Sequence, residues 1–191
     1  FYLTDAIGAI KIRGGKIVAT VFDDPDEFMG VNDRWQLAEA ARIMRMRIVR
    51  AHAMNGVTIV DPTSTYIDFE TEIEADVTIQ PMTVIEGHTR IASGASIGPN
   101  AWIKDSIIGH NCQVFMSHVD QATMEDDSRC GPFSNLRPGT RLGKKVKVGN
   151  FVEIKNSDIG ANSAASHLSY IGDASVGART NIGAGTITCN Y

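Results

Sequence analysis

Two basic residues stand at matching positions in the second half of the chain. Arg137 and Lys155 each directly follow a branched aliphatic residue, and they are 18 residues apart. If the chain winds with that period, the two cations lie above one another at about 5 Å and repel. A phosphate group held by both would offset this repulsion, since arginine grips two oxygens and lysine adds a point charge. The alternative is that Glu153 or Asp173 neutralises them.

A histidine follows this pair within the next repeat. His167 lies in a stretch of small and polar residues, with Tyr170 three positions later and Asn181 further along. Histidine has an unperturbed pKa near neutrality, so His167 is the candidate general base. A lone histidine is more often a surface or packed residue, and the chain has four others. None of those four shares a neighbourhood with Arg, Lys, Tyr and Asn, and this favours His167.

These residues must be positioned by a repeat of aliphatic residues, mostly six apart. The anchor positions are 67, 73, 79, 85, 91, 97, 103, 108, 114, 119, 124, 130, 136, 142, 148, 154, 159, 165, 171, 176, 182 and 188. A period of six fits neither an α-helix nor a continued strand. It predicts a parallel β-helix of hexapeptide repeats, with inward-pointing anchors and three hexads in each coil. The hexapeptide class is left-handed, an exception to the usual crossover rule.

The residues before this repeat predict a different structure. A strand is expected over 16–22, after the glycine turn at 14–15, and an acidic loop follows. Residues 34–54 are rich in Ala, Leu, Met and Arg, which favour a helix. Asp33, three residues before Gln36, suggests a capping box, and Gly56 would end the helix.

Composition narrows the class of protein. The chain has 191 residues, 43% of them hydrophobic, which suffices for a packed core. A net charge of -4 argues against nucleic acid as the main partner. No apolar run reaches the length of a membrane helix. Three scattered cysteines predict neither a disulfide framework nor a zinc site, and a reduced cytoplasmic protein is expected.

Several runs resemble a known family. They are GPFSNLRPG at 131–139, VGNFVEIK at 148–155, HLSYIGD at 167–173, NIGAGTITCNY at 181–191, YLTD at 2–5 and GVNDR at 30–34. In this order they resemble the bacterial bifunctional N-acetylglucosamine-1-phosphate uridylyltransferase / glucosamine-1-phosphate N-acetyltransferase. The resemblance spans the whole chain.

The resemblance implies a fragment of a cytoplasmic enzyme of UDP-N-acetylglucosamine biosynthesis, on the path to peptidoglycan and lipopolysaccharide. Residues 1–56 would be a small α/β remnant of the uridylyltransferase domain with a linker helix. Residues 57–191 would be a truncated left-handed β-helix acetyltransferase domain. The family assembles as trimers, with acetyl-CoA bound between neighbouring β-helices.

The resemblance also implies a role for each site residue. His167 would be the catalytic base that takes a proton from the amine of glucosamine 1-phosphate. Arg137 and Lys155 would bind the sugar phosphate, in agreement with the stacking argument. The remaining roles would be substrate contacts for Tyr170 and Asn181, acetyl-CoA contacts for Ala184, Asn190 and Tyr191, and Mg²⁺ binding in the uridylyltransferase site for Asn32.

The sequence departs from the family at one position near the histidine. The family usually has a Ser-Lys pair shortly before the catalytic histidine, but here Ser163 is followed by Ala164. Two alternatives therefore stand beside acetyl transfer. One is a trimeric β-helix that folds without turnover, and the other is a related hexapeptide acyltransferase or sugar nucleotidyltransferase.

Overall fold

The computed structural model describes residues 2–189. The chain divides into two compact units, Phe1–Ala40 and Ala41–Tyr191, which are described separately. Among the described residues, no helix is both long and apolar enough to cross a membrane.

The first unit contains helices and extended chain. It holds α1 (Leu3–Ile12), the short 3-10 helix η1 (Pro25–Phe28) and the start of α2 (Arg34–Met54). The strand expected over 16–22 is wrong, because no strand is present among residues 2–40. A strand needs a neighbour to bond its backbone, and the described part of this unit offers none.

Helix α2 has the predicted bounds and a modified form of the predicted cap. The Asp33 carboxylate accepts a hydrogen bond from the backbone N–H of Gln36 at 2.8 Å. The Gln36 side chain accepts from the N–H of Asn32 at 2.6 Å, one residue earlier than a capping box requires. Two of the free N–H groups around the start of the helix are therefore satisfied.

Gly56 ends α2, as predicted. Its φ of +94° is a conformation that glycine adopts without steric cost. The N–H of Gly56 bonds the carbonyl of Ala53 at 3.2 Å, and the N–H of Val57 bonds that of His52 at 3.1 Å. These are the two hydrogen bonds of a Schellman motif, and the β-helix begins directly after it.

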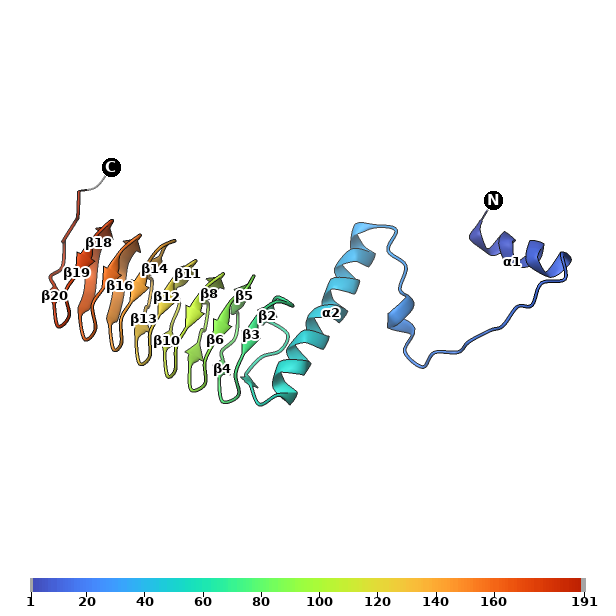
Figure 1. Ribbon diagram of the computed structural model, residues 1–191, viewed down its shortest axis with the longest axis horizontal. Helices are drawn as coiled ribbons and strands as arrows, with labels where there is room; N and C mark the ends of the chain where they lie inside the picture. Colours follow the sequence, from blue (N-terminus) through green and yellow to red (C-terminus); the bar gives the residue numbers. More distant parts are fainter. Residues whose placement is uncertain (1, 190–191) are drawn as a thin grey trace. The chain divides into compact units, whose positions relative to one another are not determined.

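The strands of the β-helix lie on three faces, and Figure 1 labels strands from each of them. The first face carries β1 (Thr58–Ile59), β4 (Thr78–Ile79), β7 (Ser96–Ile97), β10 (Gln113–Val114), β13 (Arg129–Cys130), the starts of β16 (Lys147–Lys155) and β18 (Ala164–Gly172), and β20 (Asn181–Ile182). The second carries β2 (Tyr66–Ile67), β5 (Val84–Glu86), β8 (Trp102–Lys104), β11 (His118–Asp120), β14 (Asn135–Leu136) and the ends of β16 and β18. The third carries β3 (Glu72–Ile73), β6 (Arg90–Ile91), β9 (Ile107–Ile108), β12 (Thr123–Met124), β15 (Arg141–Leu142), β17 (Asp158–Ile159) and β19 (Ser175–Val176).

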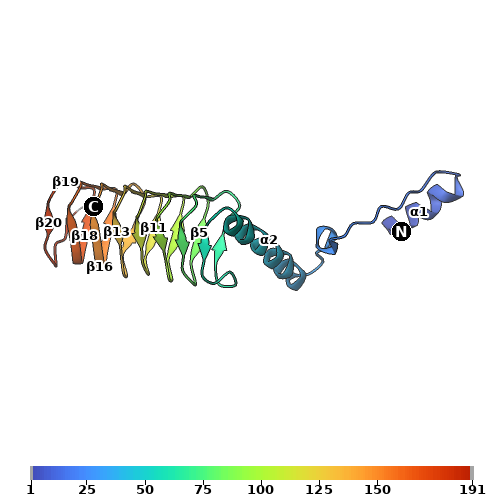
Figure 2. The same cartoon turned by 90° about the horizontal axis from the view of Figure 1, so that it is seen from below.

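Every strand pairs in parallel with strands of the neighbouring coils, as Figure 2 shows from a second side. On the first face Ile97 pairs with Val114, and Val114 pairs with Cys130, so one coil takes 16 or 17 residues there. This confirms the predicted mainly β fold, a parallel β-helix built from hexapeptide repeats.

The anchors fill the interior of the coil. Those from Ile79 to Ile171 are all buried, and Ile73, Val176 and Ile182 near the two ends are partly buried. Their stacking removes aliphatic surface from water along the whole prism. A second inward column was not predicted. Two positions before most anchors stands a buried serine or threonine, and these are Thr65, Thr71, Thr83, Thr89, Ser106, Ser117, Ser128, Ser134, Thr140, Ser157, Ser163 and Ser169.

The C-terminal half of α2 packs against the first coil. Val49 is 2% exposed and belongs to the same hydrophobic cluster as Val57 and the anchors. The Arg45 guanidinium lies 4.4 Å from the centre of the Tyr66 ring, a cation–π contact with strand β2. The helix thus covers apolar surface that the first coil would otherwise expose.

Candidate functional site

Two long strands bend around the corner between the first and second faces. β16 and β18 pair over this whole stretch, from Val148 with Ala165 to Ile154 with Ile171. In earlier coils the same corner separates two short strands. The corner of β18 carries His167, which is exposed and stands opposite Asn150 of β16. The candidate base therefore lies on an outer edge of the β-helix.

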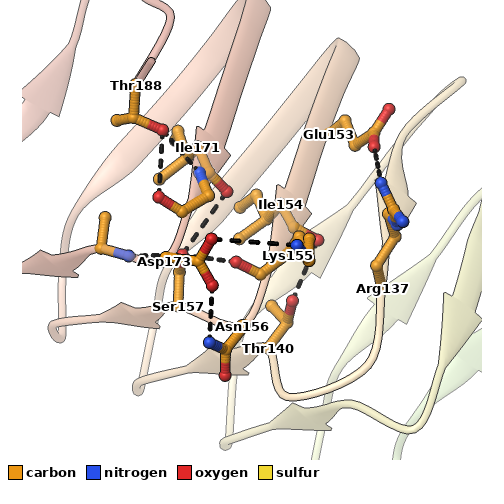
Figure 3. A network of polar contacts seen from close by, with 12 residues as sticks. Arg137, Thr140, Glu153, Ile154, Lys155, Asn156, Ser157, Ile171, Asp173 and Thr188 are labelled. Atoms are coloured by element: carbon orange, nitrogen blue, oxygen red, sulfur yellow. Dashed lines mark hydrogen bonds and ion pairs between the residues drawn. The ribbon is translucent and has the colours of Figure 1, made fainter. Parts of the chain in front are cut away.

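Arg137 and Lys155 are aligned as the sequence predicted. Leu136 pairs with Ile154, and the backbone N–H of Arg137 donates to the carbonyl of Ile154 at 2.8 Å. The two cations therefore follow paired anchors on successive coils of the second face (Figure 3). The pairing of β14 with β16 is therefore enough to align the two positive charges.

Each of the two cations has a carboxylate partner. Nη1 of Arg137 lies 2.7 Å from Oε1 of Glu153, and Nζ of Lys155 lies 3.8 Å from Oδ2 of Asp173. The hydrogen bond that Arg137 donates to Glu153 raises the pKa of Arg137 above its usual value. The chain thus neutralises the pair with its own carboxylates, which is the alternative that the sequence left open.

These ion pairs leave hydrogen-bonding capacity toward solvent. Arginine carries five N–H donors, and the contact with Glu153 occupies one nitrogen. The distance from Lys155 to Asp173 is that of an ion pair without a hydrogen bond, so the three ammonium protons stay available. The Arg137 side chain is 44% exposed and the Lys155 side chain 36%. Both charged groups are therefore accessible from solvent.

Tyr170 belongs to the same face as the cation pair. It stands opposite Glu153 in the register of β16 and β18, and an isolated bridge joins it to Ile187 on the other side. An electrostatic interaction with Tyr170 also raises the pKa of Arg137, after the larger effect of Glu153. The structure therefore brings together Arg137, Glu153 and Tyr170.

Asn181 and Ala184 lie around the corner from that group. Asn181 pairs with Ala164 on the first face, and Ala165 pairs with Ile182. Both Asn181 and Ala184 are exposed. The N–H of Gly185 bonds the carbonyl of Leu168 at 2.8 Å, which holds the segment after Ala184 next to the corner that bears His167.

The candidate residues thus occupy two faces and the corner between them. Asn190 and Tyr191, the other two predicted acetyl-CoA contacts, lie outside the described residues. The sequence missed Asn156, whose side-chain amide donates to Asp173 at 2.6 Å. The sequence did contain a signal for this contact. Asn156 and Asp173 each stand two positions after an anchor, and the two anchors belong to successive coils.

The metal prediction concerns the first unit. Asn32 is exposed there, and the neighbouring Asp33 carboxylate is engaged in the helix cap. Across residues 2–189, no three His, Cys, Asp or Glu side chains gather so that they could hold a metal ion. A single amide oxygen does not meet the six oxygen ligands of Mg²⁺. The described residues therefore do not form a magnesium site by themselves.

Comparison with known proteins decides the family resemblance. Proteins named bifunctional protein GlmU match all 191 residues, at 50% identity in Geobacillus thermodenitrificans, 49% in Geobacillus sp. WCH70 and 46% in Streptococcus agalactiae. The whole chain resembles the GlmU proteins. It spans 42% of the length of each of these GlmU relatives. No family model matches the chain.

Solved structures show weaker likeness than the GlmU sequences. The acetyltransferase domain of PglB from Neisseria gonorrhoeae, in complex with acetyl coenzyme A, has a TM-score of 0.26 and 16% identity, over 59% of this chain and 53% of that one. A mutant GDP-perosamine N-acetyl transferase from Caulobacter crescentus, in complex with CoA and GDP-perosamine, has a TM-score of 0.30 and 17% identity, over 76% of this chain and 59% of that one. Likeness at this level carries no argument about function, so the GlmU resemblance stands on sequence.

Proposed function

We propose that the chain carries an acetyltransferase site that moves the acetyl group of acetyl-CoA to the amine of glucosamine 1-phosphate. The observation that supports this most is the register of β14, β16 and β18. It aligns Arg137 with Lys155 and puts His167 on the next coil. Similarity to GlmU proteins along the full chain supports the choice of substrate class.

The cation pair binds the phosphate of the sugar. Arg137 turns its unoccupied N–H groups to two phosphate oxygens, and Lys155 adds its ammonium group. Tyr170 on the same face and Asn181 around the corner contact the sugar. The sugar is thereby oriented with its amine toward His167, and this orientation is a large part of the rate gain.

His167 acts as the general base. It takes a proton from the sugar nitrogen as that nitrogen attacks the thioester carbonyl, and a C–N bond forms. The tetrahedral intermediate then collapses, the C–S bond breaks, and the proton passes to the departing thiolate of CoA. A backbone N–H near Ala184 donates to the oxyanion, an interaction worth about 3 kcal/mol. Asn190 and Tyr191 contact acetyl-CoA.

We further propose that the β-helix works as a homotrimer. Apolar side chains with positive φ line the corner that bears the candidate base, and we call them the corner ridge: Met82, Met116, Phe133, Phe151 and Leu168. Phe133, Phe151 and Leu168 are 50%, 60% and 62% exposed. Phe133, Phe151 and Leu168 form an unbroken row on three successive coils, whereas Asn100 takes the corner position between Met82 and Met116. An exposed apolar row of this kind marks an interaction surface. A neighbouring copy would cover the ridge and complete the acetyl-CoA site beside His167.

The N-terminal segment is assigned separately. We propose that residues 1–56 are the end of a uridylyltransferase domain with its linker helix, and 57–191 the acetyltransferase domain. In a protein of the length of the GlmU relatives, Asn32 would then join acidic residues from outside this chain around Mg²⁺. That half would use UTP and release UDP-N-acetylglucosamine.

A panel of acceptors tests the proposed substrate. The chain is mixed with acetyl-CoA and with glucosamine 1-phosphate, glucosamine 6-phosphate or glucosamine, and the N-acetylated product is measured by mass spectrometry. We expect the product to form from the 1-phosphate, and at least tenfold more slowly from the other two. Equal rates for all three would refute phosphate recognition by Arg137 and Lys155. A folded chain with no product from any acceptor would support the inactive β-helix instead.

A further inference from the structure

The carboxylate of Asp173 is fixed from several directions. Its Oδ1 accepts a hydrogen bond from the amide nitrogen of Asn156 at 2.6 Å, and its Oδ2 lies 3.8 Å from Nζ of Lys155. Its backbone N–H donates to the carbonyl of Lys155 at 3.0 Å. Figure 3 shows the carboxylate between the lysine and the amide. A bent backbone, with φ of +49° at Asp173, aims the side chain back over the preceding coil.

Lys155 needs a carboxylate partner to restrain its side chain more than Arg137 does. A lysine side chain has four rotatable bonds and a single point charge, and it loses much rotational freedom when a ligand fixes it. Arg137 is already held by a hydrogen bond to Glu153 at 2.7 Å. The longer contact with Asp173 attracts the ammonium group without occupying its protons. Lys155 is therefore confined while it can still donate to a ligand.

We propose that Asp173, itself held by Asn156, is a positioning residue that fixes the Lys155 ammonium group for the phosphate of the substrate. The inference rests on the proposed function and deepens it. Asp173 has no contact with substrate in this account, and it acts on the ligand through Lys155. Asn156 prevents the carboxylate from turning toward the phosphate, where its charge would repel the ligand.

The test replaces Asp173 by asparagine. Asp173→Asn keeps an oxygen that can accept from Asn156, but it removes the charge that attracts Lys155. We expect the KM for glucosamine 1-phosphate to rise about two- to fivefold, as loss of a partly exposed ion pair allows. The KM for acetyl-CoA should not change, and kcat should fall less than KM rises. A general loss of folding would instead lower kcat and affect both substrates.

A matched control comes from the same corner of an earlier coil. Asp105 also has a positive φ, of 44°, its N–H donates to the carbonyl of Glu86 at 3.2 Å, and its carboxylate accepts from the N–H of His88 at 3.0 Å. In the described part of the chain, these hydrogen bonds join Asp105 to Glu86 and His88 and to none of the candidate site residues. We expect Asp105→Asn to leave both KM values as in the parent chain. An equal rise in KM for Asp105→Asn and Asp173→Asn would overturn the positioning role.

Binding of glucosamine 1-phosphate without acetyl-CoA tests the positioning role independently of the proposed reaction. Calorimetry measures the Kd of glucosamine 1-phosphate for the parent chain, Asp173→Asn, Lys155→Gln and the double variant. We expect Asp173→Asn to weaken binding in the parent but not in the Lys155→Gln background, because its effect passes through the lysine. Equal weakening in both backgrounds, or no weakening in either, overturns the proposal. Binding that follows this pattern without turnover would support the positioning role and refute acetyl transfer.

Discussion

Two features of the structure position Arg137 and Lys155: the backbone register of their strands and the carboxylates beside their charged ends. The backbone register fixes where each side chain leaves the coil, and the carboxylates of Glu153 and Asp173 then restrain the charged ends. Each ion pair is partly exposed, so it contributes little to the stability of the fold. Under the proposed function, the two ion pairs hold the like charges where one phosphate dianion would bind both.

Arg137→Lys tests the guanidinium itself. Lysine keeps the charge but loses the planar arrangement that holds Glu153 and phosphate at once. We expect the KM for glucosamine 1-phosphate to rise about tenfold, since one or two charge-assisted hydrogen bonds are lost. The control is Arg141→Lys, because Arg141 pairs with Glu125 on the third face in the same way. A similar rise in KM in both variants would contradict the role of Arg137.

The buried thiols predict both reactivity and pH dependence. Burial raises the pKa of Cys130 to about 12 and also raises that of Cys112, whereas Cys189 is exposed. At pH 8 a thiol reagent should label Cys189 in the native chain and all three cysteines in denaturant.

The same pKa shift of Cys130 affects stability. The unfolded thiol ionises above pH 9, while the folded thiol stays protonated to about pH 12. The free energy of unfolding should therefore be unaffected by this group below pH 9. It should fall by about 1.4 kcal/mol per pH unit above pH 9. Urea denaturation from pH 8 to 10.5 measures the slope, and a slope unchanged in Cys130→Ala would contradict this assignment.

At the scale of the elements, the anchors connect the core to the site. Ile154 is fully buried, and its neighbours in sequence are Glu153 and Lys155. Because strand residues alternate between the two sides, an inward anchor forces both neighbours outward. The hydrophobic pattern therefore sets which polar residues share a face.

Ile154→Ala should weaken both the core and the site. We expect the free energy of unfolding to fall by about 2–5 kcal/mol, because the cavity in a stacked column cannot close easily. Ile107→Ala is the matched control, since Ile107 is 51% exposed on strand β9 and should lose less than about 1 kcal/mol. Urea denaturation measures both values, and equal losses in the two variants would contradict the anchor assignment.

The sequence predicted the repeating strands well. It predicted the contacts of the inward polar side chains and the structure before the repeat less well. The period of Ile, Val and Leu residues was enough to place the strands and to align Leu136 with Ile154, because burial selects the register. It did not predict the inward serines and threonines, whose hydroxyls bond corner carbonyls, as Ser157 does to Lys155 at 2.7 Å. It also failed over 16–22, where the composition favours a strand but residues 2–40 contain none.

The carboxylate partners of the two cations were also found only from the structure. Glu153 and Asp173 were both candidates by spacing, but spacing does not give side-chain direction. Backbone bends at Asn156 and Asp173, with φ of 44° and 49°, bring the amide and carboxylate together. The hydrophobic pattern does not encode these bends.

At the scale of the whole molecule, the corner ridge predicts assembly. Light scattering should give three times the 20.7 kDa mass of the chain. Phe151→Asp places a charge on the exposed ridge and should shift the mass toward one chain, because a buried unpaired charge opposes association. Phe69→Asp, at a residue 85% exposed and outside the ridge, should leave the mass unchanged. A monomeric parent chain would contradict the proposed trimer.

Release of thiol from acetyl-CoA tests the central claim most directly. It is measured for the chain and for His167→Ala, each with and without glucosamine 1-phosphate. We predict release that requires the sugar phosphate and falls about 10²- to 10⁴-fold in the variant, the usual contribution of a general base. Release that requires the sugar but continues at the parent rate in His167→Ala would contradict the role of the histidine. No release from the folded parent chain would contradict acetyl transfer by these coils.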